Sequence, residues 1–213
     1  MNIPDELQSM LNGQISPTKQ KAARLVVDLA VTAGVNEFIR VENAHVSGVS
    51  VITGGHGLRR FLQDISDDPE GMVSIPTTLN SAGCDSDKIE QMNIDYPDFL
   101  EQQFEIINSY SKLGIEAILS CTPYDRNIEI PSGIGSWAES NAVCFSNSYT
   151  SLITNRESGL SALATAITGW APRWGLHIQE NRAPNIYVDV KCEMNNPTDW
   201  SILGDWIVKN INP

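Results

Sequence analysis

The predicted fold is built around Ala117-Ile118-Leu119-Ser120-Cys121-Thr122-Pro123-Tyr124. The first four residues form a short, mostly apolar run that predicts a buried strand. Cys121 follows where this strand is expected to end, and Pro123 stops regular structure soon after it. Because open α/β sheets bind ligands beyond the carboxyl ends of their strands, Cys121 is a candidate site residue.

A second informative stretch is Gly133-Ile134-Gly135-Ser136-Trp137-Ala138-Glu139-Ser140-Asn141-Ala142-Val143. We expect its two glycines to make residues 133–136 a flexible loop. The loop leads to three successive polar residues, Glu139, Ser140 and Asn141, which lie among apolar neighbours. A carboxylate, a hydroxyl and an amide in such surroundings indicate a site.

Helices and strands are predicted to alternate along the rest of the chain. Ser16-Pro17 has the residues of a helix start, and Gly34 and Gly169 are placed to end helices. The expected helices cover residues 3–10, 17–33, 58–65, 97–112, 160–168 and 200–211; the expected strands cover 37–41, 72–76, 117–120 and 186–190. Residues 143–145 fit a short strand or a helix equally well. Polar loops over 42–50 and 77–83 follow the first two strands. This order predicts an α/β fold with a largely parallel sheet flanked by helices, whose polar loops gather at one edge.

Composition excludes several classes of partner. The 213 residues, 41% of them apolar, are enough for one domain with a sizeable core. A net charge of -12 repels phosphate backbones and anionic lipid surfaces, so neither nucleic acid nor a membrane is an expected partner. Because no apolar run is long enough to span a bilayer and the first residues lack the order of a secretion signal, we expect a cytoplasmic protein.

Two local patterns carry little functional information. The cysteines at 84, 121, 144 and 192 contain no Cys-x-x-Cys pair, which argues against both a disulfide framework and a zinc site. Residues 53–57 form a glycine-rich stretch that we expect to be a loop before a helix. It lacks the Lys-Ser/Thr ending of a phosphate-binding loop and the spacing of a dinucleotide fingerprint, so a nucleotide-binding module has little support.

Five separate blocks of sequence resemble the aconitase X family, a branch of the aconitase superfamily of hydro-lyases. The blocks are His45-Val46-Ser47-Gly48, Pro76-Thr77-Thr78-Leu79-Asn80, Ser120-Cys121-Thr122-Pro123-Tyr124, Trp137-Ala138-Glu139-Ser140-Asn141-Ala142-Val143 and Thr154-Asn155-Arg156-Glu157. Their order and spacing also fit, and the resemblance covers nearly the whole chain. It implies a single aconitase-like layered α/β domain over residues 1–213, equivalent to the N-terminal part of the family's large catalytic subunit.

The resemblance implies a dehydratase that removes water from a small hydroxy acid at an iron–sulfur cluster, with a 4Fe–4S cluster as our expectation. Mevalonate 5-phosphate and cis-3-hydroxy-L-proline are the two substrates known for the family, and the His45-Val46-Ser47-Gly48 block favours the first. The alternative from a different class is a non-catalytic remnant that binds a partner or a small acid without turnover.

The same resemblance implies roles for individual residues. Cys121 would be one of three thiolate ligands of the cluster, since soft sulfur ligands suit iron. Glu139 is the candidate for handling the leaving oxygen, and His45 and Ser140 are further catalytic candidates. The expected substrate-binding residues are Ser47, Thr78, Asn80, Asn141 and Arg156. A guanidinium such as that of Arg156 binds a carboxylate or phosphate through two parallel hydrogen bonds.

The chain lacks the later segments in which the family's large subunit carries its other two cluster cysteines. Nor do Cys84, Cys144 and Cys192 lie in family ligand positions. The family also pairs the large subunit with a small swivelling domain. We therefore expect a second chain that supplies the missing half and a small swivelling-domain subunit, unless the chain is a truncated product that is inactive alone.

Each candidate residue has a purely structural alternative. Cys121 is a buried small apolar residue in this reading, and Glu139 caps a helix. Asn80 and Asn141 are then turn residues with left-handed backbone, and Arg156 forms a surface ion pair.

The histidines and tryptophans outside the blocks are more simply structural. His56 fits a loop or cap, and His177 fits packing near the edge of the sheet. Tryptophans most often anchor a core or an interface. Trp200 and Trp206 fall in the expected terminal helix and would be exposed in the isolated chain if the missing half docks there.

Overall fold

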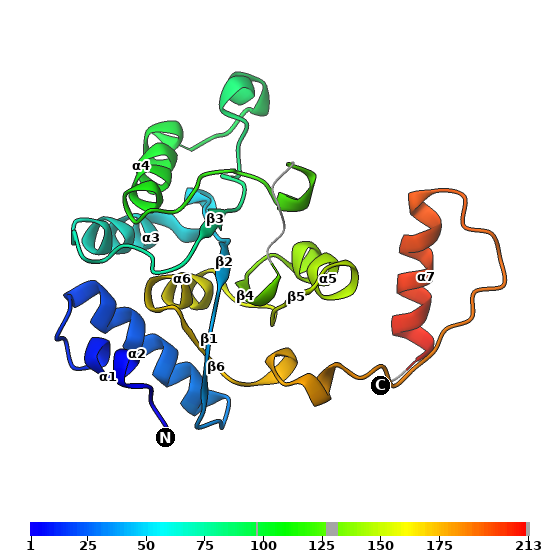
Figure 1. Ribbon diagram of the computed structural model, residues 1–213. Coiled ribbons are helices and arrows are strands. Elements are labelled where there is room, and N and C mark those ends of the chain that lie inside the picture. The colour runs from blue at the N-terminus through cyan, green and yellow to red at the C-terminus, as the bar shows by residue number, and fades with distance from the viewer. Residues whose placement is uncertain (97, 127–131, 212–213) are drawn as a thin grey trace. The chain divides into compact units, whose positions relative to one another are not determined.

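The computed structural model describes residues 1–96, 98–126 and 132–211 and divides into two compact units, unit 1 (Met1–Asn181) and unit 2 (Arg182–Pro213). The α-helices are α1 (Asp5–Leu11), α2 (Pro17–Thr32), α3 (Val51–Ser66), α4 (Phe99–Lys112), α5 (Ser140–Tyr149), α6 (Gly159–Thr168) and α7 (Pro197–Asn210) (Figure 1). The strands are β1 (Phe38–Arg40), β2 (Asn43–Val46), β3 (Thr77–Leu79), β4 (Gly133–Trp137), β5 (Leu152–Ile153) and β6 (Trp170–Pro172). None of the described helices has the length and apolar character needed to cross a membrane.

The central sheet of unit 1 has four parallel strands in the order β3-β2-β4-β5. Ala44 in β2 pairs with Thr77 of β3 on one side and with Ser136 of β4 on the other. Parallel neighbours need crossover connections, and α3, α4 and α5 lie in the three connections between successive strands. The predicted α/β fold with a largely parallel sheet flanked by helices is confirmed.

Both faces of this sheet are covered, which is why its strands are buried. Val46 and Leu79 point toward one face, where they join a core cluster with residues of α2, α3, α4 and α6. Trp137 and Leu152 belong to a smaller cluster on the other face, with Ala142 and other residues of α5. The carboxyl edge of the sheet therefore lies between helices of both layers.

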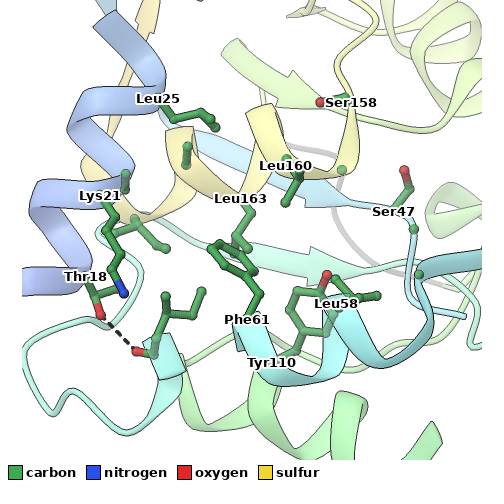
Figure 2. A pocket seen from close by; sticks show the side chains of 18 of the residues that line it. Thr18, Lys21, Leu25, Ser47, Leu58, Phe61, Tyr110, Ser158, Leu160 and Leu163 are labelled. Carbon is green, nitrogen blue, oxygen red and sulfur yellow. Dashed lines mark hydrogen bonds between the residues drawn. The ribbon is translucent and has the colours of Figure 1, made fainter. Parts of the chain in front are cut away.

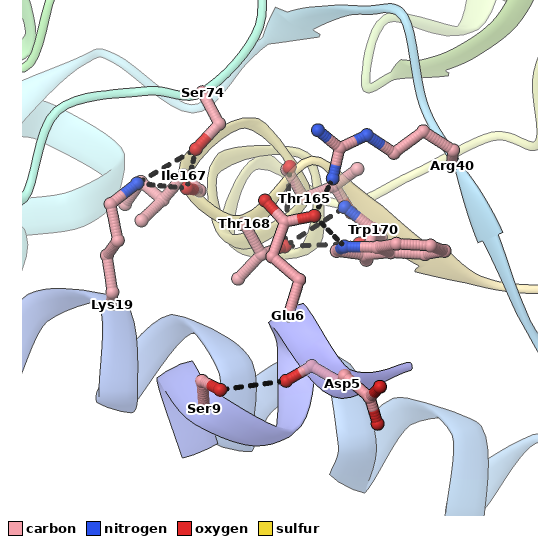
Figure 3. Close-up of polar contacts among 10 residues, drawn as sticks. All are labelled: Asp5, Glu6, Ser9, Lys19, Arg40, Ser74, Thr165, Ile167, Thr168 and Trp170. Atoms are coloured by element: carbon pink, nitrogen blue, oxygen red, sulfur yellow. Dashed lines mark hydrogen bonds and ion pairs between the residues drawn. The ribbon is translucent and has the colours of Figure 1, made fainter. Parts of the chain in front are cut away.

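A second sheet in unit 1 consists of one antiparallel pair of strands. β1 pairs with β6, and the Arg40 guanidinium lies 5.2 Å from the ring centre of Trp170. Nearby, Lys19 Nζ donates to the carbonyl oxygen of Ile167 at 2.9 Å and to Ser74 Oγ at 2.8 Å (Figure 3). A cation at the carboxyl end of α6 is favourable there, and partial burial lowers the pKa of Lys19.

Several helix boundaries follow the predicted capping residues. Ser16 Oγ accepts a hydrogen bond from the Lys19 N–H at 3.1 Å and so starts α2. The predicted helix over 200–211 starts earlier than expected, at Pro197 of α7, where Asn196 supplies a capping box. Gly169, with φ of 76°, ends α6 in the left-handed conformation that glycine adopts most easily.

The strand predicted over residues 117–120 is wrong. Glu116 forms one bridge with Thr78, but residues 117–120 join no strand among the described residues. Ala117 is exposed, and Leu119 has a φ of 51°, which no regular strand contains. A short apolar run can belong to a loop as well as to a strand, and residues 117–120 belong to a loop.

The flexible loop predicted over residues 133–136 is also wrong, because these residues begin β4. A Cβ at Gly135 would lie 2.9 Å from Leu152 Cδ1, so glycine serves close strand packing here. Part of the polar loop predicted over 42–50 is β2, whose polar residues Asn43 and His45 are buried. The strand predicted over 72–76 is displaced, since β3 begins only at Thr77.

Three smaller predictions are corrected or decided by the structure. The glycine-rich residues 53–57 lie inside α3, which is kinked at Gly55 (φ 55°), and do not form a loop before it. Residues 143–145 continue a helix, α5. Residues 186–190 form no strand among the described residues. Pro97, the predicted start of the helix over 97–112, lies outside the described residues.

Candidate active site

The four parallel strands bring the predicted polar loops to one edge of the sheet, as expected. Ser47 follows β2, Asn80 follows β3, and Glu139 lies just beyond β4. Backbone hydrogen bonds continue the strand pairing into these loops: Asn80 N–H donates to the Val46 carbonyl at 2.8 Å, and Ala138 N–H donates to the His45 carbonyl at 2.9 Å. The sheet therefore fixes the backbone of the loops that carry the candidate side chains.

Glu139 occupies the N-cap position of α5, but its side chain makes no capping hydrogen bond. Its Oε2 instead accepts a hydrogen bond from Asn80 Nδ2, across the edge of the sheet. Asn80 is buried, and its Oδ1 accepts from the Ser81 N–H at 2.6 Å, which sets the direction of the amide. The carboxylate is thus held toward the loop after β3. Glu139 does stand at the start of α5, as the capping alternative expects, but without a capping hydrogen bond.

The turn alternative for the two asparagines is wrong as well. Asn141 lies in the first turn of α5, and Asn80 continues the pairing of β3. The described non-glycine residues with positive φ lie elsewhere, at Asn93, Asp98 and Leu119.

Cys121 is half-buried and is contacted from two sides. Its Sγ lies 3.1 Å from Ser81 Oγ, and its carbonyl oxygen accepts from Asn141 Nδ2 at 2.9 Å. Glu139 is thus connected to the Cys121 thiol by successive contacts with Asn80 and Ser81. A separate contact, from Asn141, connects Cys121 to α5. Sequence reasoning missed Ser81, although its place directly after Asn80 in the polar loop was an available signal.

His45 lies within the sheet and is fully buried. Its Nδ1 is 2.8 Å from Thr78 Oγ1 on the neighbouring strand, and its ring centre lies 5.4 Å from that of Trp137. Burial lowers the pKa of His45 to about 4, so the imidazole is neutral at pH 7. Nε2 has no hydrogen-bond partner among the described residues. At neutral pH this side chain can offer a hydrogen bond but not an imidazolium proton.

The remaining candidates differ in exposure. Ser47 Oγ donates to the Ala138 carbonyl at 3.3 Å, across the gap between β2 and β4. Ser140 is exposed at the first position of α5. Arg156 is also exposed, after β5, and forms no ion pair with the described residues. The ion-pair alternative for Arg156 is therefore not seen in this part of the chain.

His177 has the structural role that we expected. It is buried, with Nε2 3.1 Å from the Gly135 carbonyl and Nδ1 3.3 Å from Asn155 Nδ2. These contacts attach the segment after β6 to β4.

The donor set for a metal is incomplete in this chain. Across the described ranges, no group of three or more His, Cys, Asp or Glu side chains is arranged to hold a metal ion. Cys84, Cys144 and Cys192 are free thiols like Cys121. Cys121 therefore offers one soft donor at the edge of the sheet.

A cavity of about 560 Å³ lies between α2, α3 and α6 (Figure 2). Leu25, Phe61 and Leu160 give it a largely apolar wall, and Ser47 and Ser158 lie at one end of it. Through Ser47 the cavity meets the edge that carries the candidate site.

Comparison with known proteins gives consistent matches. The family model described as the aconitase X first domain matches residues 1–180. A phosphomevalonate dehydratase large subunit from Thermococcus kodakarensis is 37% identical over 99% of this chain and 52% of its own length. The protein of the same name from Methanosarcina mazei is 35% identical over 96% of this chain and 50% of its own length. A cis-3-hydroxy-L-proline dehydratase from Pseudomonas aeruginosa is 30% identical over 86% of this chain and 31% of its own length.

A solved structure agrees with these sequence matches. The crystal structure of Thermococcus kodakaraensis aconitase X in its holo-form matches with a TM-score of 0.85 and 36% identity, over 100% of this chain and 52% of that chain. The chain thus spans about half the length of the curated phosphomevalonate dehydratases that it matches.

Proposed function

The chain belongs to the aconitase X family, and from this premise we propose that it forms the first domain of a dehydratase that removes water from a small hydroxy acid. Mevalonate 5-phosphate is our first choice of substrate, because two relatives that are 35% and 37% identical to the chain are named phosphomevalonate dehydratase large subunits. Cis-3-hydroxy-L-proline is the second choice. We place the enzyme in the cytoplasm, as expected from the sequence.

The observation that carries the proposal is the position of Glu139. Its carboxylate leaves the helix-capping position unused and is held by Asn80 at the carboxyl edge of a parallel sheet. Dehydration needs a group that accepts a proton and a group that returns one to the departing oxygen. We assign the group at the departing oxygen to Glu139, whose half-buried carboxylate is oriented before any substrate arrives.

Other side chains at this edge suit binding. We assign an anionic substrate group, carboxylate or phosphate, to Arg156, whose guanidinium is exposed and forms no ion pair with described residues. Ser47, Ser140 and Asn141 supply hydroxyl and amide groups for the remaining polar atoms. His45, being neutral, holds Thr78 by a hydrogen bond and is not the acid at pH 7.

The residues present fit one ligand position of an iron–sulfur cluster. The Cys121 thiol is half-buried at the carboxyl edge of the sheet, and the Ser81 hydroxyl approaches its sulfur. When bound, such a cluster, of the 4Fe–4S type in our proposal, supplies a Lewis-acidic iron. We propose that the other ligands come from polypeptide that the relatives have in addition to the part matched here.

Two partners follow from this proposal. One is a polypeptide with the second half of the large subunit, since the relatives are about twice as long as the matched region. The other is a small swivelling-domain subunit, in keeping with the words large subunit in the names of the relatives. The competing proposal is that the chain is a non-catalytic remnant. It would bind a partner or a small acid at this edge of the sheet without turnover.

Anaerobic reconstitution tests the proposal. The chain is reconstituted alone and together with the second half and the small subunit, and the visible spectrum, iron content and turnover of both hydroxy acids are measured. We expect a cluster and dehydration only in the combined sample. No cluster and no turnover in any combination would support the remnant.

Two variants and one control variant make the test specific. Cys121→Ala should abolish the cluster, whereas Cys144→Ala, which removes an exposed free thiol on α5, should leave it intact. Glu139→Gln should keep the cluster and lower kcat by about 100-fold or more, the usual scale for losing a general acid–base group. Equal iron in Cys121→Ala and the parent protein would contradict the ligand assignment.

A further inference from the structure

The cavity of about 560 Å³ between α2, α3 and α6 is lined by residues of unit 1. Pockets for small organic ligands have volumes of about 300 to 1,000 Å³, so this cavity has the size of a ligand site. Protein interiors are closely packed and leave few voids larger than a water molecule. A space of this size between three packed helices therefore exceeds an ordinary packing void.

The walls of the cavity are apolar but are not covered by other parts of unit 1. Leu25 of α2, Phe61 of α3 and Leu160 of α6 face the same space and are 37%, 38% and 50% exposed (Figure 2). Leu163, which is buried, lies behind them. A hydrocarbon chain placed between these helices would remove apolar surface from water on both sides, which is favourable.

Gly57 of α3 also lines the cavity, and nothing in the chain requires a glycine there. Its backbone is helical, and an added Cβ would meet no atom within 4 Å. Glycine in a helix interior is less stable than alanine, so this position lowers the stability of α3. The missing side chain leaves the cavity open. Such a loss of stability is typical of positions where function needs free space.

The cavity has a single charge, and that charge is positive. Among the described residues that line it, Lys21 alone is charged, and its ammonium forms no ion pair with any described residue. Lys21 lies on α2, across the cavity from Ser47 and Ser158 (Figure 2). An unpaired ammonium beside apolar walls suits a ligand that has an anionic head group and an apolar body.

This cavity is distinct from the place proposed above for the hydroxy acid. Neither Cys121 nor Glu139 is among the described residues that line it. A small hydroxy acid carries polar groups along most of its length and would leave them unpaired against leucine and phenylalanine, which is unfavourable. The two places meet only at Ser47.

We propose that the cavity binds an amphipathic anion, a medium-chain carboxylate or phosphate monoester. Its head group lies at Lys21, and its hydrocarbon chain lies between Leu25, Phe61 and Leu160 and extends toward Ser47. The proposal goes beyond the proposed function and does not rest on it, because this binding needs neither a cluster nor turnover.

Calorimetric titration of the full chain with four probes tests the site. Decanoate and decyl phosphate separate the two head groups, decanol keeps the chain without the charge, and butyrate keeps the charge on a short chain. We expect saturable one-to-one binding of at least one of the two long-chain anions, with a negative heat-capacity change from apolar burial. Decanol should bind about tenfold more weakly, and butyrate should not bind. Methyl NMR should show shifts at Leu25 and Leu160.

Variants at the two ends of the argument have matched controls. Lys21→Gln should lower the affinity for the long-chain anion about tenfold, whereas Arg24→Gln, which removes an exposed charge of α2 outside the cavity, should not. Gly57→Leu should lower it by a similar factor or more without loss of thermal stability, since leucine fills the free space. Gly204→Leu, at a position of α7 where a Cβ also meets nothing within 4 Å, should leave binding unchanged.

The results that would overturn the proposal are specific. They are no saturable binding of either long-chain anion, equal binding of decanol, or unchanged affinity in both Lys21→Gln and Gly57→Leu. The titration is repeated on the combined sample with the second half and the small subunit, where binding should persist. Loss of binding in a complex that has formed would show that protein fills the cavity. Binding without dehydration in that sample would contradict only the proposed function.

Discussion

At Asn80 a single amide connects two functional groups of the candidate site. Its Nδ2 donates to the Glu139 carboxylate, while its Oδ1 accepts from the Ser81 N–H at 2.6 Å. Ser81 in turn places its hydroxyl 3.1 Å from the Cys121 sulfur. Because Asn80 is buried, neither hydrogen bond is easily replaced by water. The geometry of the carboxylate and the thiol therefore depends on this residue.

Asn80→Ala should lower the free energy of unfolding by about 2 kcal/mol, because it leaves a half-buried carboxylate without its donor and removes a second hydrogen bond. Urea unfolding followed by circular dichroism measures the change. Asn36→Ala, at an exposed position, is the control and should fall within about 0.5 kcal/mol of the parent chain. A loss no larger than that of the control would show that the Asn80 contacts contribute little.

His45 should make the chain less stable as the pH falls from 6.5 to 4. Burial lowers the pKa of the folded-state imidazole to about 4, against an ordinary value of 6.5. Below pH 6.5 the unfolded chain takes up a proton that the folded chain does not, so this contribution is complete above pH 6.5 and is lost as the pH falls. Between pH 7 and pH 5 the loss is about 2 kcal/mol.

Urea midpoints of the parent chain and of His45→Gln at both pH values check this expectation. The variant should lose about 2 kcal/mol less than the parent over that interval. Asn36→Ala, at an exposed residue that does not titrate, should keep the parent's pH dependence. An unchanged pH dependence in His45→Gln would show that another group is responsible.

At the residue scale, sequence patterns predicted which polar residues gather at the edge of the sheet but not which of them are in contact. The polar residues after the strands were identifiable from their position, and they do gather at one edge of the sheet. Which side chains touch depends on strand order, because Asn80 and Glu139 meet only when β2 and β4 are neighbours and β3 lies beside β2. The same order buries His45, whose sequence neighbours give no sign of a depressed pKa.

Among the elements, α6 packs directly on one of the loops of the candidate site. Its first residue, Gly159, packs directly on the loop after β2: a Cβ there would lie 2.2 Å from the Ser47 carbonyl oxygen. Its other end is held by Lys19 on α2. The helix therefore connects the edge of the sheet to the outer layer.

Gly159→Ala should destabilise unit 1 by about 2 kcal/mol, because the added methyl group meets backbone that cannot move away without disturbing β2. Gly57→Ala is a matched control on α3, where the added Cβ meets nothing within 4 Å, and it should raise stability by up to about 1 kcal/mol. Thermal and urea unfolding of both variants test the pair. Equal effects at the two glycines would contradict the close packing of α6 on the Ser47 loop.

Helices were predicted better than strands, for physical reasons. Capping residues and the 3.6-residue period are local, so α2, α6 and α7 followed from sequence. The strands are only two to five residues long, too short for a period to be distinguished. In β4, Gly135, one of the two glycines that suggested a loop, leaves room for the side chain of Leu152 on the next strand, which is contact information that the local sequence lacks.

For the whole molecule, the two units differ in how their stability arises. The core clusters of unit 1 consist of residues between Ile3 and Ala171, so its burial is internal. Unit 2 has an exposed helix and an unpaired segment. We therefore expect unit 1 to fold without unit 2.

Truncation after Asn181 should therefore leave unit 1 folded, with a free energy of unfolding within about 0.5 kcal/mol of the full chain, since every residue of its core clusters remains. Denaturant unfolding and hydrogen exchange of residues 1–181 measure this. A control truncation after Gly169 removes β6, the partner of β1, and His177, and it should lower stability clearly. A 1–181 chain that unfolds would show that unit 1 needs unit 2.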